Sequence, residues 1–144
     1  MSILQTPPDL VIRVLIVDDH PFVRAGVADI LITAGGIEVV GESDDGSTVP
    51  ALAARSHPHV VLMDLRMPKM SGIEATRALL AEQPDARVMM LTGSDGEGNR
   101  SEAADSGAVG FLLKGGDPDT LVAAVRRVAN GGTAWPDDVP PAAW

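Results

Sequence analysis

The stretch VLIVDDHP (residues 14–21) places an apolar run directly before two adjacent aspartates. Its first four residues are β-branched or aliphatic, which is typical of a strand covered on both faces. Pro21 closes the stretch, and the first turn of a helix tolerates proline. The stretch therefore predicts a buried strand, an acidic loop and a helix, the first unit of an α/β fold. Because neighbouring carboxylates repel each other, Asp18 and Asp19 require water or a cation between them.

The succession of an apolar run and a helical pattern repeats along the chain. The runs are nearly continuous in apolar residues, as buried parallel strands are. They are VIRVLIV (11–17), IEVVGES (37–43), VVLMD (60–64), RVMMLT (87–92) and VGFLLK (109–114). Five such runs separated by helical patterns predict an α/β fold with a doubly wound, five-stranded parallel sheet.

Local signals predict where the helices lie. Gly35 ends the first helix, and Asp117 opens the last one. Ser71 with Glu74 three residues later is a capping-box pattern. Residues at helical spacing predict the apolar face of the first helix: Phe22, Val23, Val27, Ile30 and Leu31.

The fourth helix is predicted to be short and weak. The segment GSDGEGNRSEAADSGA (93–108) contains only three alanines as apolar residues. A helix of about two turns over 99–106 would have little apolar surface to bury. We expect a marginally stable helix there.

Composition excludes several classes of function. The chain has no cysteine, which excludes disulfides and thiolate metal sites. Its net charge is −9 without a cluster of Lys and Arg, so direct nucleic-acid binding by this chain is not expected. No apolar stretch approaches the roughly 20 residues of a membrane span. The N-terminus lacks a basic segment followed by an apolar one, so we expect no signal peptide and a cytoplasmic location.

The chain of 144 residues has the size of one domain. We predict a flexible lead-in over 1–10, a domain over 11–131 and a linker or tail over 132–144. The tail, TAWPDDVPPAAW after Gly132, is rich in proline and contains no pattern for a further folded unit.

Polar residues stand where the predicted strands end. In doubly wound sheets, ligands bind at the carboxyl ends of the strands. Asp18, Asp19 and Asp64 end the first and third strands, Thr92 ends the fourth and Lys114 the fifth. Three carboxylates at one edge favour a cation, and oxygen ligands suit Mg²⁺.

An ammonium group, a hydroxyl and a cation around one carboxylate suit phosphoryl chemistry, which depends on positioning and charge neutralisation. Asp64 is the predicted nucleophile, since it stands alone at its strand end. Asp18 and Asp19 would hold the metal, together with the backbone carbonyl of Arg66. Each residue alone also fits a structural role such as a helix cap, and only the set favours the functional interpretation. His20 is interpreted as a helix-start residue rather than a ligand.

Four motifs together resemble the receiver domain of bacterial two-component response regulators. They are VLIVDDHPFVRAGV, VVLMDLRMPKMSGIEA, VMMLTGSD and GAVGFLLK, and the resemblance spans about residues 12–130. It is strongest to the NarL/FixJ (LuxR-type) branch. It implies a flavodoxin-like (βα)5 fold with strand order 2-1-3-4-5.

The resemblance also implies roles for single residues. Asp64 matches the phosphorylated aspartate, and Asp18 and Asp19 match the acidic pair that organises Mg²⁺. Lys114 matches the lysine that contacts the phosphoryl group. Thr92 matches the switch hydroxyl that also approaches this group, and Phe111 the coupled switch aromatic.

The resemblance further implies partners. A sensor histidine kinase would supply the phosphoryl group, and a homodimer would form through the fourth helix, fifth strand and fifth helix. DNA would be bound only through a C-terminal domain that this chain does not contain. The chain is either a stand-alone receiver or part of a longer regulator, and its linker-like end favours the second.

Two other functions stay open. A Mg²⁺-dependent phosphohydrolase also forms an aspartyl phosphate, but it commonly carries a second Asp two residues later, where this chain has Arg66. A phosphorylation-independent interaction module would use the same fold, but would have no need of the acidic set with Thr92 and Lys114.

Overall fold

The computed structural model describes residues 10–93 and 97–136. Its strands are β1 (Ile12–Val17), β2 (Ile37–Ser43), β3 (Val60–Met63), β4 (Val88–Thr92) and β5 (Gly110–Leu113). Its helices are α1 (Pro21–Ala34), the short 3-10 helix η1 (Gly46–Thr48), α2 (Val49–Ser56), α3 (Gly72–Glu82), α4 (Glu97–Ser106) and α5 (Pro118–Ala129). Strands and helices alternate as predicted.

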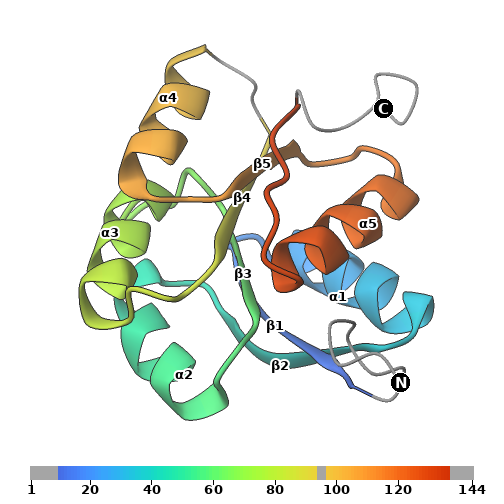
Figure 1. Cartoon of the computed structure of the whole chain (residues 1–144). Helices are drawn as coiled ribbons and strands as arrows, with labels where there is room; N and C mark the ends of the chain where they lie inside the picture. The colour runs from blue at the N-terminus through green and yellow to red at the C-terminus, as the bar shows by residue number, and fades with distance from the viewer. Residues whose placement is uncertain (1–9, 94–96, 137–144) are drawn as a thin grey trace.

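The five strands form one parallel sheet in the order β2-β1-β3-β4-β5, which confirms the predicted fold. Helices α1 and α5 cover one face, and α2, α3 and α4 cover the other (Figure 1). Because all strands run the same way, their carboxyl ends lie at one edge of the sheet. Among the described residues, no helix is long and apolar enough to cross a membrane.

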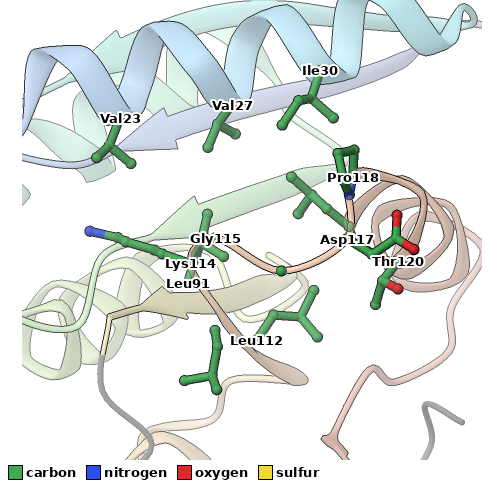
Figure 2. A pocket seen from close by; sticks show the side chains of 13 residues that line it. Val23, Val27, Ile30, Leu91, Leu112, Lys114, Gly115, Asp117, Pro118 and Thr120 are labelled. Atoms are coloured by element: carbon green, nitrogen blue, oxygen red, sulfur yellow. The ribbon is translucent and has the colours of Figure 1, made fainter. Parts of the chain in front are cut away.

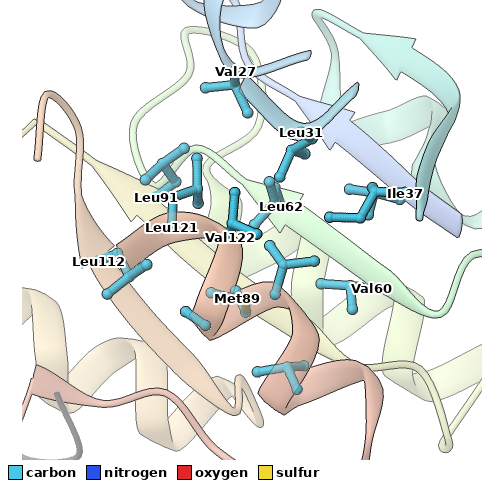
Figure 3. Close-up of a cluster of buried hydrophobic side chains, with 14 of the residues drawn as sticks. Val27, Leu31, Ile37, Val60, Leu62, Met89, Leu91, Leu112, Leu121 and Val122 are labelled. Carbon is cyan, nitrogen blue, oxygen red and sulfur yellow. The ribbon is translucent and has the colours of Figure 1, made fainter. Parts of the chain in front are cut away.

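Each face of the sheet has its own buried core. On the α1/α5 side, Leu31 of α1 and Val122 of α5 pack over Leu62 at the centre of the sheet (Figure 3). On the other side, Phe111 and Met90 lie beneath α3 and α4. Two covered faces explain why the strands are nearly continuous in apolar residues.

The helix boundaries follow the local signals. Ser71 accepts a hydrogen bond from the Glu74 amide and Glu74 returns one to the Ser71 amide, so the predicted capping box is present. Gly35 ends α1 with φ of 83°, a conformation that glycine adopts without strain. Asp117 caps α5 by accepting from the Asp119 amide.

The predicted apolar face of α1 is wrong at one position. Val27 and Leu31 are buried, whereas Phe22 is 92% exposed. At about 100° per residue, Phe22 is turned about 140° away from Val27 around the helix axis, and this directs its ring to solvent.

Helix α4 is longer than the predicted two turns, with bounds Glu97–Ser106. Ala103 is fully buried against the sheet, and the polar residues Asn99 and Ser106 are buried beside it. The Ser106 hydroxyl donates to the Ala103 carbonyl at 2.6 Å. This bond lies within the helix, and a contact that joins α4 to another part of the chain is the hydrogen bond from Arg66 to Asn99 Oδ1.

Residues beyond the predicted domain end extend the sheet. The Ala134 amide donates to the Val109 carbonyl at 2.9 Å, and the Ala134 carbonyl accepts from the Phe111 amide at 3.0 Å. Ala134 is fully buried, and Trp135 packs against the core beneath α4. Of the predicted lead-in over 1–10 only Leu10 is described, and residues 137–144 of the predicted tail also lie outside the described residues. The boundary at residue 131 stays a prediction.

Candidate functional site

The acidic residues are placed by the backbone ladder of neighbouring strands. The Asp18 amide donates to the Ser43 carbonyl at 2.9 Å, and the Asp64 amide donates to the Val17 carbonyl at 2.8 Å. These bonds continue the pairing of β1 with β2 and β3 by one residue. Asp18 and Asp64 therefore meet at the carboxyl edge of the sheet, and each is only 3% exposed.

Lys114 brings a positive charge to the same point from the end of β5. Its Nζ lies 2.7 Å from Asp18 Oδ2 and 3.1 Å from Asp64 Oδ1. The backbone amide of Lys114 donates to the Thr92 carbonyl at 2.7 Å, which extends the pairing of β4 with β5. One ammonium group contacts two of the three carboxylates that meet here, so negative charge remains uncompensated.

Burial and charge act differently on the two buried carboxyls. Burial raises the pKa of Asp64 to about 6, the Asp18 charge adds to the increase, and Lys114 opposes it. Burial also acts to raise the pKa of Asp18, but hydrogen bonds from Lys114 and His20 outweigh it and lower that pKa. Burial acts to lower the pKa of Lys114, but its bonds to Asp18 and Asp64 raise it. Without a further cation, Asp18 is therefore the more readily ionised carboxyl.

The donor set fits a divalent cation. Oxygen Oδ2 of Asp64 and Oδ1 of Asp19 are buried and have no hydrogen-bond partner among the described residues. Burying such oxygens unpaired is costly, and a bound cation removes the cost. Carboxylate oxygens with uncompensated negative charge are what Mg²⁺ prefers in proteins.

His20 is the site residue whose side-chain position the sequence did not reveal. It is the N-cap of α1, as expected of a helix-start residue, but its side chain makes no capping hydrogen bond. Its Nδ1 lies 2.9 Å from Asp18 Oδ1 and 3.1 Å from Asp19 Oδ1. The available signal was its position directly after the acidic pair, which places it at the same edge of the sheet.

A glycine allows α3 to begin directly against the acidic site. A Cβ atom on Gly72 would overlap the backbone carbonyl of Asp64. The Gly72 amide donates to the Leu65 carbonyl at 2.9 Å. The close approach of α3 therefore holds the loop that carries Asp64.

The other predicted residues surround this centre. Thr92 is buried at the end of β4, and Phe111 is buried in the core beneath α4. The guanidinium of Arg66 donates to Asn99 Oδ1 on α4 at 2.6 Å, so it ties the loop after Asp64 to that helix. A role for the Arg66 carbonyl in metal binding stays a prediction.

An apolar cavity of about 160 Å³ adjoins the site between α1 and the start of α5. Val23 and Val27 of α1 face Leu112 and Pro118 across it (Figure 2). Lys114 also lines this cavity, but its ammonium group points away from it (Figure 2). The cavity is thus beside the acidic site and separate from it.

The family described as "Response regulator receiver domain" matches residues 14–126. The chain belongs to this family. The receiver domain is 42% identical over 121 residues to the transcriptional regulatory protein DegU of Brevibacillus brevis, covering 84% of this chain and 51% of that protein. It is 40% identical over 127 residues to the nitrate/nitrite response regulator protein NarP of Escherichia coli. This match covers 88% of this chain and 59% of that protein.

Solved structures agree with this assignment. The signal receiver domain of NarL from Mycobacterium tuberculosis matches with a TM-score of 0.80 and 37% identity, over 84% of this chain and 98% of that one. A LuxR-family response regulator from Aurantimonas sp. SI85-9A1 matches with a TM-score of 0.83 and 35% identity. This match covers 88% of this chain and 91% of that one. The resemblance to the NarL/LuxR-type branch is confirmed, and the receiver domain has a regulatory role rather than that of a catalyst. It spans between half and two thirds of the length of the curated relatives named above.

Proposed function

We propose that Asp64 is the phosphoacceptor of this receiver domain and that Mg²⁺ binds beside it. The observation that carries the proposal is the meeting of three carboxylates and one ammonium group at a single point of the sheet edge. Asp18, Asp19, Asp64 and the Arg66 carbonyl are the proposed ligands. The bound ion would supply positive charge to the phosphoryl oxygens.

Asp64 acts as the nucleophile. An oxygen of its carboxylate attacks phosphorus, a P–O bond forms, and the bond to the donor breaks with its electron pair leaving on the donor. Lys114 already lies 3.1 Å from Asp64 Oδ1, so its charge would face the transferred group. Burial, and then the charge of Asp18, raise the pKa of Asp64 to about 6. A bound cation would oppose this increase and so favour the ionised carboxylate, which is the nucleophile.

The buried Thr92 and Phe111 are proposed to carry the signal. Thr92 ends the strand between β3 and β5, and its hydroxyl would move toward the phosphoryl group. Phe111 is packed beneath α4, so a shift of its ring would change the surface formed by α4, β5 and α5. We propose that this surface mediates dimerisation and that a sensor histidine kinase is the donor. We also propose that the protein is cytoplasmic and that DNA is bound by a separate C-terminal domain.

Phosphodonor labelling of an Asp64→Asn variant tests the assignment. We expect base-labile labelling of the wild type in the presence of Mg²⁺, no labelling with a chelator, and none in the variant. Asp29→Asn, which changes an exposed aspartate on α1, is the matched control and should be labelled like the wild type. Unchanged labelling of Asp64→Asn would remove Asp64 from the mechanism, and multiple turnover of phosphate esters would favour a phosphohydrolase instead.

A further inference from the structure

The apolar cavity between α1 and the start of α5 is large for a domain of this size. Its volume is about 160 Å³. Protein interiors are close-packed and contain few voids larger than a water molecule. Apolar cavities of about 150 Å³ stay dry and can hold a molecule such as benzene. This cavity therefore has room for a small organic molecule.

The cavity exists because the residues around it do not reach far enough to fill it. Val23, Val27 and Ile30 follow one another at intervals of four and three residues, so they share the face of α1 that turns toward the cavity (Figure 2). The loop between β5 and α5 runs along the cavity through Gly115 and Gly116, which have no side chains. A Cβ atom on Gly115 would meet no other atom within 4 Å.

Of the described residues that line the cavity, two are charged, and both direct their charge elsewhere. Lys114 holds its ammonium group against Asp18 and Asp64, away from the cavity (Figure 2). Asp117 is exposed and accepts a hydrogen bond from the Asp119 amide, as the cap of α5. An ion that entered the cavity would lose its hydration without gaining a partner of opposite charge.

We propose that this cavity is a binding site for a small, uncharged, apolar molecule of about the size of one aromatic ring. Such a molecule would pack on the buried side chains of Leu91 and Leu112 from the sheet and of Leu121 from α5. Its burial removes apolar surface from water on both sides of the contact, which favours binding. The proposal concerns a second site and does not rest on Asp64 as the phosphoacceptor or on a bound metal ion.

A second hollow provides a route into the cavity. It lies between α1 and α5 and is more open to solvent than the first. Ile30 and Pro118 line both hollows, so the two meet at these side chains. A ligand can therefore enter along the surface between the two helices, without passing the acidic site.

Titration of the whole chain with benzene, followed by NMR of isotope-labelled methyl groups, tests the proposal. We expect saturable shifts at the methyl groups of Val23, Val27 and Leu112. Val61 and Leu79 belong to the core on the other face of the sheet and should not respond. Benzoate carries a charge on the same ring and should bind more weakly by about tenfold or more.

Val27→Phe fills the cavity from α1, and Ile32→Phe is the matched control. Ile32 is 58% exposed on the same helix, so its replacement adds a ring outside the cavity. We expect Val27→Phe to weaken benzene binding by about tenfold or more and Ile32→Phe to leave it unchanged. If Val27→Phe does not fold, Val23→Leu narrows the cavity by one methylene group and should weaken binding by about threefold.

Three results would overturn the proposal. Shifts that fail to saturate, or that spread equally over both cores, would show that benzene has no defined site. Unchanged affinity in the folded filling variant would place the site elsewhere. Equal affinity for benzoate would show that the site is not selective for uncharged molecules.

Discussion

His59 shows how one side chain can make the stability of this domain depend on pH. Its Nδ1 accepts a hydrogen bond of 2.8 Å from the Arg13 amide, at the edge of the sheet opposite the acidic site. Burial lowers the pKa of His59, and the charge of Arg13 lowers it further. Protonation would remove the acceptor and place a second positive charge beside Arg13.

We predict that the domain loses stability through His59 as the pH falls below the ordinary histidine pKa of about 6.5. In that range the unfolded chain binds more protons than the folded one, so stability rises with pH. The change should be about 1 kcal/mol, the contribution of one hydrogen bond. Urea unfolding with a chelator at pH about 7.5 and about 5.5 measures it.

His59→Asn retains an acceptor that does not titrate. The difference between wild type and variant therefore isolates His59 from the titration of the acidic site. An identical pH dependence for the two chains would contradict the prediction.

At the scale of elements, α3 and α4 hold the loop that carries Asp64. Helix α3 begins at Gly72, directly against the backbone of Asp64, and Arg66 joins the same loop to Asn99 of α4. A displacement of either helix would therefore reach the acidic site through the backbone, without any change in the acidic residues themselves.

We predict that Gly72→Ala destabilises the domain by about 1–3 kcal/mol, because the added Cβ overlaps the Asp64 carbonyl and forces the backbone to move. It should also weaken metal binding, since Asp64 moves with its carbonyl. Chemical unfolding and metal titration measure the two effects.

Gly26→Ala is the control for a glycine in a helix. A Cβ on Gly26 meets no atom within 4 Å, so alanine there should stabilise the domain by about 0.5–1 kcal/mol through helix propensity. A neutral Gly72→Ala would show that α3 can move without disturbing the site.

At the scale of the whole molecule, the sheet separates two cores and brings the acidic residues and Lys114 together at one edge. Helices α1 and α5 complete one core, and α2, α3 and α4 complete the other (Figure 1). Ala134 then returns the chain to the outer edge of β5, where both of its backbone groups are hydrogen bonded. The segment after α5 thus protects an edge strand from pairing with other chains.

A chain ending at Gly132 should therefore be less stable than one ending at Pro136, by about 2–3 kcal/mol. It loses two backbone hydrogen bonds and the buried Ala134 and Trp135 contacts. It should also aggregate more readily, because the edge of β5 is open. Denaturant unfolding and light scattering compare the two chains, and equal stability would exclude a structural role for this segment.

Much of the fold could be predicted because its signals are local. A continuous apolar strand, a capping box at Ser71 and a glycine at position 35 each act within a few residues. The parallel sheet then required Asp18, Asp64 and Lys114 to end strands at one edge. Their residue types and positions alone were enough to predict a cation and phosphoryl site there.

By itself the sequence determined the class of fold, the strand ends and which acidic residues reach them. Only the tertiary structure decided how Lys114 divides its charge between two carboxylates and where the imidazole of His20 points. It also decided that Phe22 faces solvent and that Asn99 anchors a helix with little apolar surface. The physical reason is range: strand and helix signals lie within a few residues, whereas these contacts join residues from different elements and depend on how those elements pack.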